Sequence, residues 1–147
     1  MGRRTSESKR KKIEAEILAA LERLIAGCGA LDMGAAFGPF SRSSEFRMIG
    51  ADGSLCDFET FYGDNVSYLG NCSAFSLATI ASDVLVLRSD LAVLSWIYRA
   101  EATLANGERD VIERAGATFV FEKREGRWVA VRYQESSLPP VRERSAE

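Results

Sequence analysis

The chain has 147 residues, of which 46% are hydrophobic and 27% are charged, and its formal net charge is −2. This is the composition of an ordinary globular protein, and the length suits one domain rather than two. These values argue against a disordered chain, a collagen-like repeat and a membrane protein, which needs roughly 20 consecutive apolar residues for each spanning helix.

The charge is unevenly distributed along the chain. Residues 1–12 contain six Lys or Arg and one Glu, about +5 in all, which leaves about −7 for the remainder. We expect residues 1–8 to form a flexible basic tail that leads into a helix. Such a basic arm could touch nucleic acid or an anionic membrane, although a solvated tail is the simpler interpretation. The acidic remainder offers no broad basic face for nucleic acid, and we expect neither nucleic acid nor a membrane as a partner.

The N-terminal half of the chain predicts helices. A stripe of apolar residues three or four positions apart indicates an amphipathic helix over residues 9–26; its members are Ile13, Ile17, Leu21, Leu24 and Cys28. A short helical segment is expected over residues 31–37. A further helix is predicted to follow Asp57, a favourable N-cap residue, and to end before Gly70, which lies past its end.

The C-terminal half predicts strands. Residues 45–49 alternate between polar and apolar types, which predicts a short strand, and a turn signal follows at residues 51–53. Four long strands are then expected, over residues 75–87, 91–104, 111–123 and 128–136. Asn106 and Gly107 are typical of a tight hairpin turn with φ above zero at both positions. Pro139 and Pro140 end the last strand.

Helices followed by an antiparallel meander indicate an α+β fold. One face of such a sheet must be covered, and strands of this length usually bend. We therefore expect N-terminal helices packed on a strongly curved antiparallel β-sheet, a cystatin-like cone with a pocket. The single domain is placed at residues 9–140, followed by a flexible tail at residues 141–147.

The chain contains no histidine. Ser-His-Asp and Cys-His nucleophile systems are therefore excluded. A structural zinc site without histidine needs four cysteines, and the chain has three. We expect no metal and no other cofactor, and any acid–base catalysis must use Asp, Glu, Tyr or Lys.

The cysteines indicate a reducing compartment. Cys28, Cys56 and Cys72 cannot all pair, and none belongs to a C-x-x-C motif. No apolar stretch follows Arg3 and Arg4, as it would in a cleavable signal peptide. We therefore expect reduced thiols and a cytoplasmic location, with Cys28 and Cys56 as small buried side chains.

Three stretches are similar to motifs of known proteins: FRMIGADG at residues 46–53, VLVLRSDLAVLSW at residues 84–96 and EGRWVAVRYQESSLP at residues 125–139. On these residues the chain resembles SnoaL-like bacterial members of the nuclear transport factor 2-like superfamily. The first resembles that family's first strand and turn. The second resembles its V-x-V-L-x-x-D-x-A-V-V-x-W hairpin, and the third its C-terminal D-G-x-W-x-V-x-H-x-H-x-S-S-x-P strand.

The resemblance covers roughly residues 10–140 and implies the cone-shaped fold. It does not imply one activity, because the superfamily includes ketosteroid isomerases, polyketide cyclases, epoxide hydrolases, dehydratases and protein-assembly domains. The two histidines of the family's last strand are replaced by Arg132 and Gln134, whereas Ser136 is retained. The isomerase base would fall near Gly50 and is missing. Asp52, in the turn, is interpreted as bonding its own backbone.

Strict alternation along the last strand places Trp128, Ala130, Arg132, Gln134 and Ser136 on one face. If that face borders the pocket, Arg132 could hold a ligand carboxylate or an enolate-like oxygen. The alternative is a salt bridge at a rim or an interface. Tyr133 would face the other way and serve an interface.

Four aromatic residues complete the candidate site. Trp96 and Tyr98 share the covered face of their strand, as pocket wall or as plain core. Phe58 and Tyr62 could close the pocket mouth, or only pack their helix on the sheet. The candidate ligand-binding residues are thus Arg132, Gln134, Trp96, Tyr98, Tyr62 and Phe58.

Two functions of different classes remain open. One is the binding of a small, partly apolar molecule without a catalytic residue set. The other is an isomerase, cyclase or dehydratase that uses a buried carboxylate and an Arg or Tyr to stabilise an oxyanion. Either is compatible with a homodimer formed through the open face of the sheet. The enzyme hypothesis requires a carboxylate inside the cavity.

Overall fold

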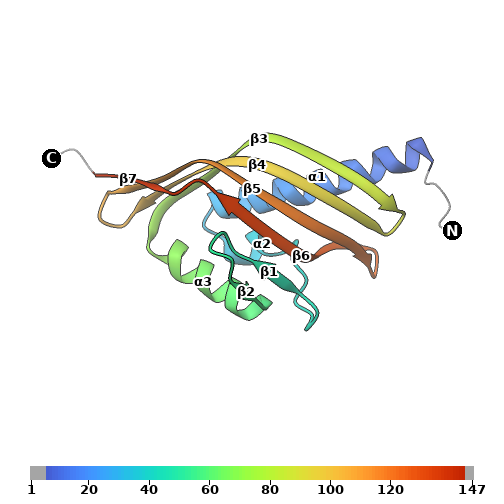
Figure 1. The fold of residues 1–147 in the computed structure, drawn as a ribbon, viewed down its shortest axis with the longest axis horizontal. Coiled ribbons are helices and arrows are strands. Elements are labelled where there is room, and N and C mark those ends of the chain that lie inside the picture. Colours follow the sequence, from blue (N-terminus) through green and yellow to red (C-terminus); the bar gives the residue numbers. More distant parts are fainter. Residues whose placement is uncertain (1–5, 145–147) are drawn as a thin grey trace.

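The computed structural model describes residues 6–144, over which the chain forms an α+β fold of helices and one sheet (Figure 1). The helices in this range are α1 (Glu7–Gly29), α2 (Met33–Ala36) and α3 (Phe58–Gly70). The strands are β1 (Arg47–Ile49), β2 (Leu55–Cys56), β3 (Cys72–Arg88), β4 (Leu91–Leu104), β5 (Arg109–Arg124), β6 (Arg127–Ser137) and β7 (Val141–Glu143). The predicted fold class is confirmed.

The sheet is mixed and mostly antiparallel. Its strand order is β2-β1-β6-β5-β4-β3, and β7 pairs with β5. The strands β3 to β6 form the predicted antiparallel meander, whereas β1 lies parallel to β6. A register shift interrupts each pairing of the meander, and such bulges bend and twist the strands that carry them.

The helix α1 is longer than predicted at both ends. The Ser6 hydroxyl accepts a hydrogen bond of 3.3 Å from the Lys9 backbone N–H, so the helix begins at Glu7. The predicted apolar stripe is buried, and its members are Ile13, Ile17, Leu21, Leu24 and Cys28. Near its end, α1 approaches α2 so closely that only glycine fits at position 27. A Cβ there would lie 2.4 Å from the backbone nitrogen of Ala36. The segment predicted as helix over residues 31–37 shortens to α2.

The two predicted tails lie partly outside the described range. Of residues 1–8, only 6–8 are described, and they belong to α1 and its cap. A flexible tail was expected at residues 141–147, but residues 141–143 form the strand β7. In this strand Glu143 pairs with Arg109 at 2.9 Å, and Arg142 donates a hydrogen bond to Asp110. These ion pairs join β7 to β5. Residues 145–147 lie outside the described range.

The turns follow the predicted positions, with one difference in conformation. Asp52 accepts hydrogen bonds from the Ser54 N–H at 2.9 Å and from its hydroxyl at 2.7 Å, which confirms it as a turn residue. These bonds lower the pKa of Asp52. At the hairpin between β4 and β5, only Gly107 has a positive φ, of 88°. Asn106 instead accepts a bond from the Glu108 N–H at 3.0 Å, which gives a longer loop than the expected two-residue turn.

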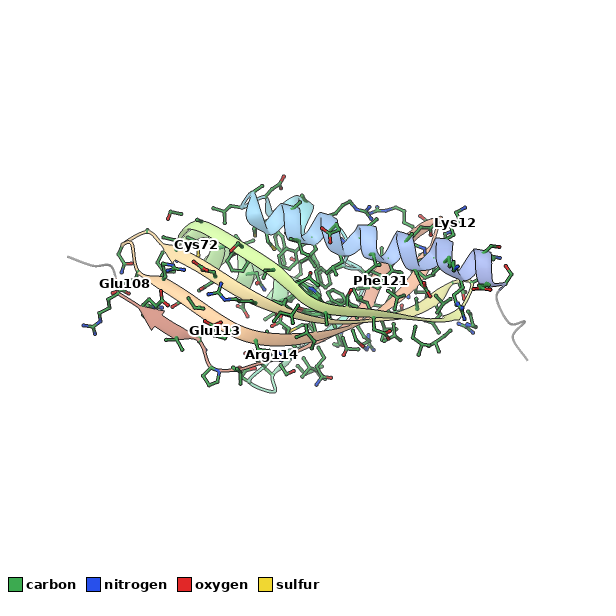
Figure 2. The ribbon with its side chains drawn as sticks, turned by 90° about the horizontal axis from the view of Figure 1, so that it is seen from above. Lys12, Cys72, Glu108, Glu113, Arg114 and Phe121 are labelled. Carbon is green, nitrogen blue, oxygen red and sulfur yellow. The ribbon has the colours of Figure 1, made fainter. Side chains whose placement is uncertain are left out.

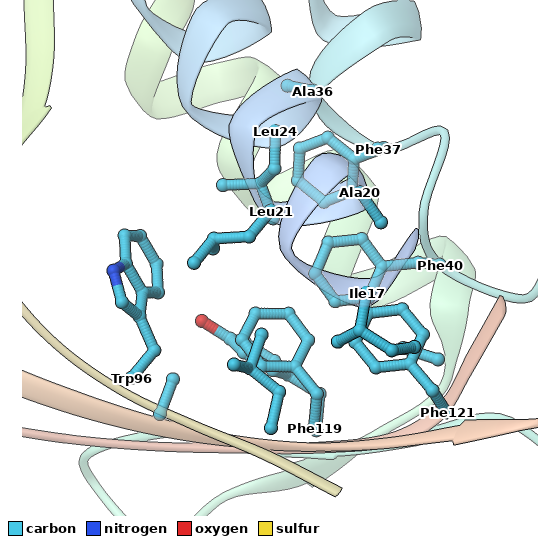
Figure 3. Packing of buried hydrophobic residues seen from close by; sticks show 14 of the residues in the cluster. Ile17, Ala20, Leu21, Leu24, Ala36, Phe37, Phe40, Trp96, Phe119 and Phe121 are labelled. Carbon is cyan, nitrogen blue, oxygen red and sulfur yellow. The ribbon is translucent and has the colours of Figure 1, made fainter. Parts of the chain in front are cut away.

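The core lies between α1 and the sheet. Figure 2 shows α1 running along one side of the sheet. In Figure 3, α1 side chains such as Ile17 and Leu21 meet Trp96, Phe119 and Phe121 from β4 and β5. In the described range, none of the helices combines the length and apolarity that crossing a bilayer would require.

Candidate functional site

A cavity of about 330 Å³ opens between the concave face of the sheet, α1 and α3. Most of its wall is apolar or aromatic, and the aromatic members are Phe37, Phe40, Phe61, Tyr68, Phe75, Trp96, Tyr98 and Tyr133. The remaining polar lining comes from Asn65, Glu101, Asp110 and Glu135. Apolar walls with a few polar groups are typical of a small-molecule site.

A β-bulge in β6 decides which side chains face this cavity. Val120 of β5 pairs with Arg132, but the next residue, Phe121, pairs with Ala130. Val131 is therefore an extra residue that has no partner of its own on β5. Because side chains alternate along a strand, one inserted residue exchanges the faces of everything that follows it.

The bulge brings Tyr133 and Glu135 into the cavity. Strict alternation had predicted Arg132, Gln134 and Ser136 on the same face as Trp128, and this prediction is wrong for these three residues beyond the bulge. Tyr133 was expected to serve an interface, but its side chain is only 6% exposed and packs in the core. The cavity therefore holds a carboxylate, as the enzyme hypothesis requires.

Tyr133 and Glu135 form a hydrogen-bonded pair. The Tyr133 hydroxyl donates to Oε1 of Glu135 at 2.6 Å. Burial raises the pKa of Glu135, against the smaller opposing effect of this hydrogen bond. Burial and then the nearby Glu135 charge also raise the pKa of Tyr98 and of Tyr133. Both phenols therefore remain protonated at neutral pH and can act as hydrogen-bond donors.

The other two carboxylates of the cavity are neutralised by arginines. Glu101 pairs with Arg99 at 2.7 Å and also with Arg109. Asp110 accepts a bond of 2.9 Å from the Tyr68 hydroxyl and another from Arg142. The Arg142 hydrogen bond is the largest cause that lowers the pKa of Asp110. The bonds of both acids therefore stabilise the packing of β7 and α3 against the sheet.

Two of the six predicted ligand residues lie on the cavity wall. Trp96 and Tyr98 both line it, and their rings stack with centroids 4.0 Å apart and planes inclined by 19°. The Trp96 indole N–H donates to the Thr79 hydroxyl at 2.9 Å, which fixes the ring on the sheet. Their placement leaves both open to contact with a ligand.

Phe58 and Tyr62 lie outside the cavity lining. Their rings stack at 5.6 Å between centroids, and Phe37 meets both edge-on. The Arg42 guanidinium lies over them, 5.0 Å from the centre of Phe58 and 5.6 Å from that of Tyr62. These contacts pack α3 against the loop before β1, whereas the alternative from the sequence expected packing on the sheet.

Arg132 and Gln134 border a hollow of about 370 Å³ on the opposite face of the sheet. Arg132 donates hydrogen bonds to the backbone carbonyls of Glu45 and Val131, so it joins β6 to the chain that enters β1. Gln134 is exposed. Neither residue contacts the cavity.

The sequence contained one signal for the missed pair. Tyr133 is an aromatic residue between two strongly polar ones, and counting alternation from it toward the C-terminus places Tyr133 and Glu135 together on the apolar face. Counting from Trp128 gives the opposite answer. The two counts conflict at Val131, and that conflict marks the bulge.

Among the residues that the structure describes, the cavity has neither a reactive thiol nor a metal site beside it. Burial raises the pKa of the Cys28 thiol on the cavity wall to about 11, so it is protonated at neutral pH. Within residues 6–144, no group of three or more carboxylates or cysteines is placed to hold a metal ion.

A larger open hollow of about 730 Å³ lies between α1 and the start of β6. Two of its charged groups, Glu16 and Lys123, pair with each other beside Trp128. Glu16 accepts a bond of 2.6 Å from the Trp128 indole N–H and lies 4.0 Å from the Lys123 ammonium, which also sits over the Trp128 ring. Nothing in this arrangement points to a ligand.

The comparisons with known proteins agree with the fold. The family model for the calcium/calmodulin dependent protein kinase II association domain matches residues 45–139. No curated protein sequence matches the chain.

Three solved structures illustrate the range of proteins with this fold. A proposed scytalone dehydratase from Novosphingobium aromaticivorans is 8% identical with a TM-score of 0.82, covering 97% of this chain and 94% of its own. A nuclear transport factor 2-like superfamily protein from Salmonella enterica is 19% identical (TM-score 0.74; 88% and 94%). The association domain of the Caenorhabditis elegans kinase is 16% identical (TM-score 0.69; 89% and 99%). The fold is thus nuclear transport factor 2-like.

Proposed function

Because the chain belongs to the calcium/calmodulin dependent protein kinase II association domain family, we propose that it is a self-associating domain that binds a small, partly apolar molecule in its cone. The observation that carries the binding role is the Tyr133–Glu135 pair inside an aromatic cavity. Self-association rests on the family and on the face of the sheet that α1 leaves uncovered.

That uncovered face, the outer sheet face, carries an apolar row. Val93 of β4 pairs with Leu85 of β3 and with Val120 of β5, so the three side chains lie side by side. Leu85 is 54% exposed. Apolar side chains gathered on an exposed sheet are typical of an interface, and a symmetric dimer places the same patch on both copies.

Sedimentation velocity tests the self-association. We expect the wild-type chain to be a dimer or a larger assembly at micromolar concentration, and Leu85→Glu to be a monomer. Leu18→Glu is the matched control, since Leu18 is an exposed leucine of α1. A monomeric wild type contradicts the proposal, as does a Leu85→Glu variant that sediments like the wild type.

Native mass spectrometry tests the small-molecule site. We expect freshly purified protein to carry a non-covalent adduct that is lost on denaturation. Ala100 lines the cavity, so Ala100→Phe should fill it and remove the adduct, whereas Ala19→Phe on the exposed side of α1 should retain it. An adduct that survives in Ala100→Phe places the bound molecule elsewhere.

A specific observation favours a second candidate function, an isomerase, cyclase or dehydratase. Glu135 has a raised pKa and lies beside two phenols, so it could move a proton while Tyr98 or Tyr133 stabilises an oxyanion. Turnover of a ketone, enone or alcohol substrate that is lost in both Glu135→Gln and Tyr133→Phe would support it. A panel on which the wild type shows no turnover would contradict it.

The finer assignments from the sequence are part of the proposal. The SnoaL-like membership is supported by the motifs at residues 46–53, 84–96 and 125–139. A cytoplasmic location is supported by three unpaired cysteines in the described range. The domain is proposed to span residues 9–140, extended in the structure by the rest of α1 and by β7.

A further inference from the structure

We propose that the cavity selects a cation: an ammonium group on an apolar body, seated against Glu135 among the aromatic rings. This inference rests on the proposed small-molecule function and names the chemical class of the ligand. Three independent observations support it, namely the charge balance of the lining, the ring surfaces around Glu135 and the hydrogen-bonding capacity left unused there.

The lining of the cavity is acidic. It includes Glu101, Asp110 and Glu135, and within the described chain it includes neither Lys nor Arg. Glu101 and Asp110 are neutralised by arginines that stand outside the cavity. Among the described residues, Glu135 forms no ion pair. Its hydrogen-bond partner there is the neutral Tyr133 hydroxyl. An ammonium ligand would supply the missing positive charge.

The rings around Glu135 offer the surface that a cation prefers. Trp96 and Tyr98 form a stacked pair on the wall, and the Tyr133 ring packs near Phe40, which also lines the cavity, with centroids 5.1 Å apart. The negative face of an aromatic ring attracts an ammonium group, and rings combined with a carboxylate recognise quaternary and primary ammonium ligands. The apolar body of the ligand would lie along the remaining Phe and Leu side chains.

The hydrogen-bonding capacity also favours a donor. The Tyr133 hydroxyl donates its proton to Glu135, so its oxygen can only accept further hydrogen bonds, and it shares this capacity between a ligand and the neighbouring Tyr98 hydroxyl. The Glu135 carboxylate has further acceptor sites as well. A primary ammonium group carries three donors and no acceptor, and it can satisfy both oxygens together. An anionic ligand would face Glu135 with like charge and lose affinity.

Binding of three small probes of similar size tests the inference. The probes are the 2-phenylethylammonium ion, neutral 2-phenylethanol and the phenylacetate ion, titrated at pH 7 into the full chain while Trp fluorescence and binding heat are recorded. We expect the ammonium probe to bind at least about tenfold more tightly than the alcohol, as befits a charge-assisted bond in a partly buried site. Phenylacetate should bind most weakly.

Variants assign the preference to Glu135. Glu135→Gln should bind the ammonium and the alcohol within about twofold of each other, whereas Glu22→Gln, which removes an exposed charge on α1, should keep the tenfold preference. Tyr133→Phe retains the Glu135 carboxylate and should keep a preference for the cation. This variant therefore distinguishes the loss of the Glu135 charge from a general disturbance of the cavity. Circular dichroism checks that each variant is folded.

The outcomes separate this inference from the function on which it rests. If the alcohol or phenylacetate binds as tightly as the ammonium probe, the cation preference is overturned while the small-molecule site stands. If all three probes fail to bind, both are overturned. If Glu22→Gln loses the preference as Glu135→Gln does, the effect is one of overall charge, and Glu135 is not the determinant.

Discussion

The Tyr133 hydroxyl and the Glu135 carboxylate lie two residues apart on β6, joined by a hydrogen bond of 2.6 Å that faces the cavity. The pair places an acid whose pKa is raised by burial next to a phenol that remains protonated at neutral pH. This relationship leads to a stability prediction that is independent of any ligand.

Glu135→Gln should stabilise the free protein at neutral pH. Burial raises the folded pKa of Glu135 above its unfolded value, so the stability it contributes is present below the unfolded pKa and is lost as the pH rises through the folded pKa. Removing the charge should therefore raise the free energy of unfolding at pH 7. Urea unfolding at pH 7 and near pH 4 should show the gain shrink at the lower pH. A Glu135→Gln variant less stable than the wild type at pH 7 would contradict this prediction.

Gly27→Ala should destabilise the fold through overpacking. A Cβ at this position would lie 2.4 Å from the Ala36 nitrogen, which is backbone and cannot rotate away. We expect a loss of about 1–3 kcal/mol in thermal or urea unfolding. Gly29→Ala is the matched control, because the nearest atom to its Cβ is the Phe75 carbonyl oxygen at 3.9 Å. Equal losses in the two variants would refute the close approach of α1 and α2.

Phe40→Ala should be among the most damaging single substitutions. The Phe40 ring meets Phe119 at 5.8 Å, Phe61 at 5.1 Å and Tyr133 at 5.1 Å between centroids, so it ties the loop before β1 to α3 and the sheet. A loss of about 3–5 kcal/mol is expected from the cavity left behind. Leu138→Ala should change stability by less than about 0.5 kcal/mol, since Leu138 is 54% exposed. A mild Phe40→Ala variant would mean that the surrounding rings collapse into the space.

Cys28 should be the slowest cysteine to react with a disulfide reagent at pH 8. Burial raises its pKa to about 11, so only about one thiol in a thousand is ionised. Cys56 and Cys72 are partly exposed and should react earlier. Peptide mapping after timed labelling distinguishes the three, and all should react at once in urea. Rapid labelling of Cys28 in the folded chain would show that the cavity wall opens.

Much of the fold could be predicted because its signals are local. The stripe from Ile13 to Cys28 fixes the buried side of α1, and the alternation from residue 75 onward predicts the meander. The N-cap role of Asp57 is confirmed by its bond of 2.9 Å from the Thr60 N–H. In each case the residues that carry the signal lie within one element, so no tertiary information is needed.

The strands that escaped prediction depend on distant partners. β2 and β7 are short, and their pairing with β1 and β5 provides the context that makes them strands. The cavity-facing pair was missed for the same reason. The extra residue in β6 is placed by its pairing with β5, so alternation read from the sequence alone could not decide between Arg132 and Tyr133.

The bulge at Val131 has a consequence for how relatives of this chain can diverge. Loss or gain of one residue in this strand would exchange a tyrosine and a glutamate for an arginine and a glutamine at the ligand, while the surrounding ladder of backbone hydrogen bonds could persist. A change of ligand charge then needs no substitution at all. Two relatives that differ by one inserted residue in this strand can therefore present opposite sets of side chains to whatever they bind.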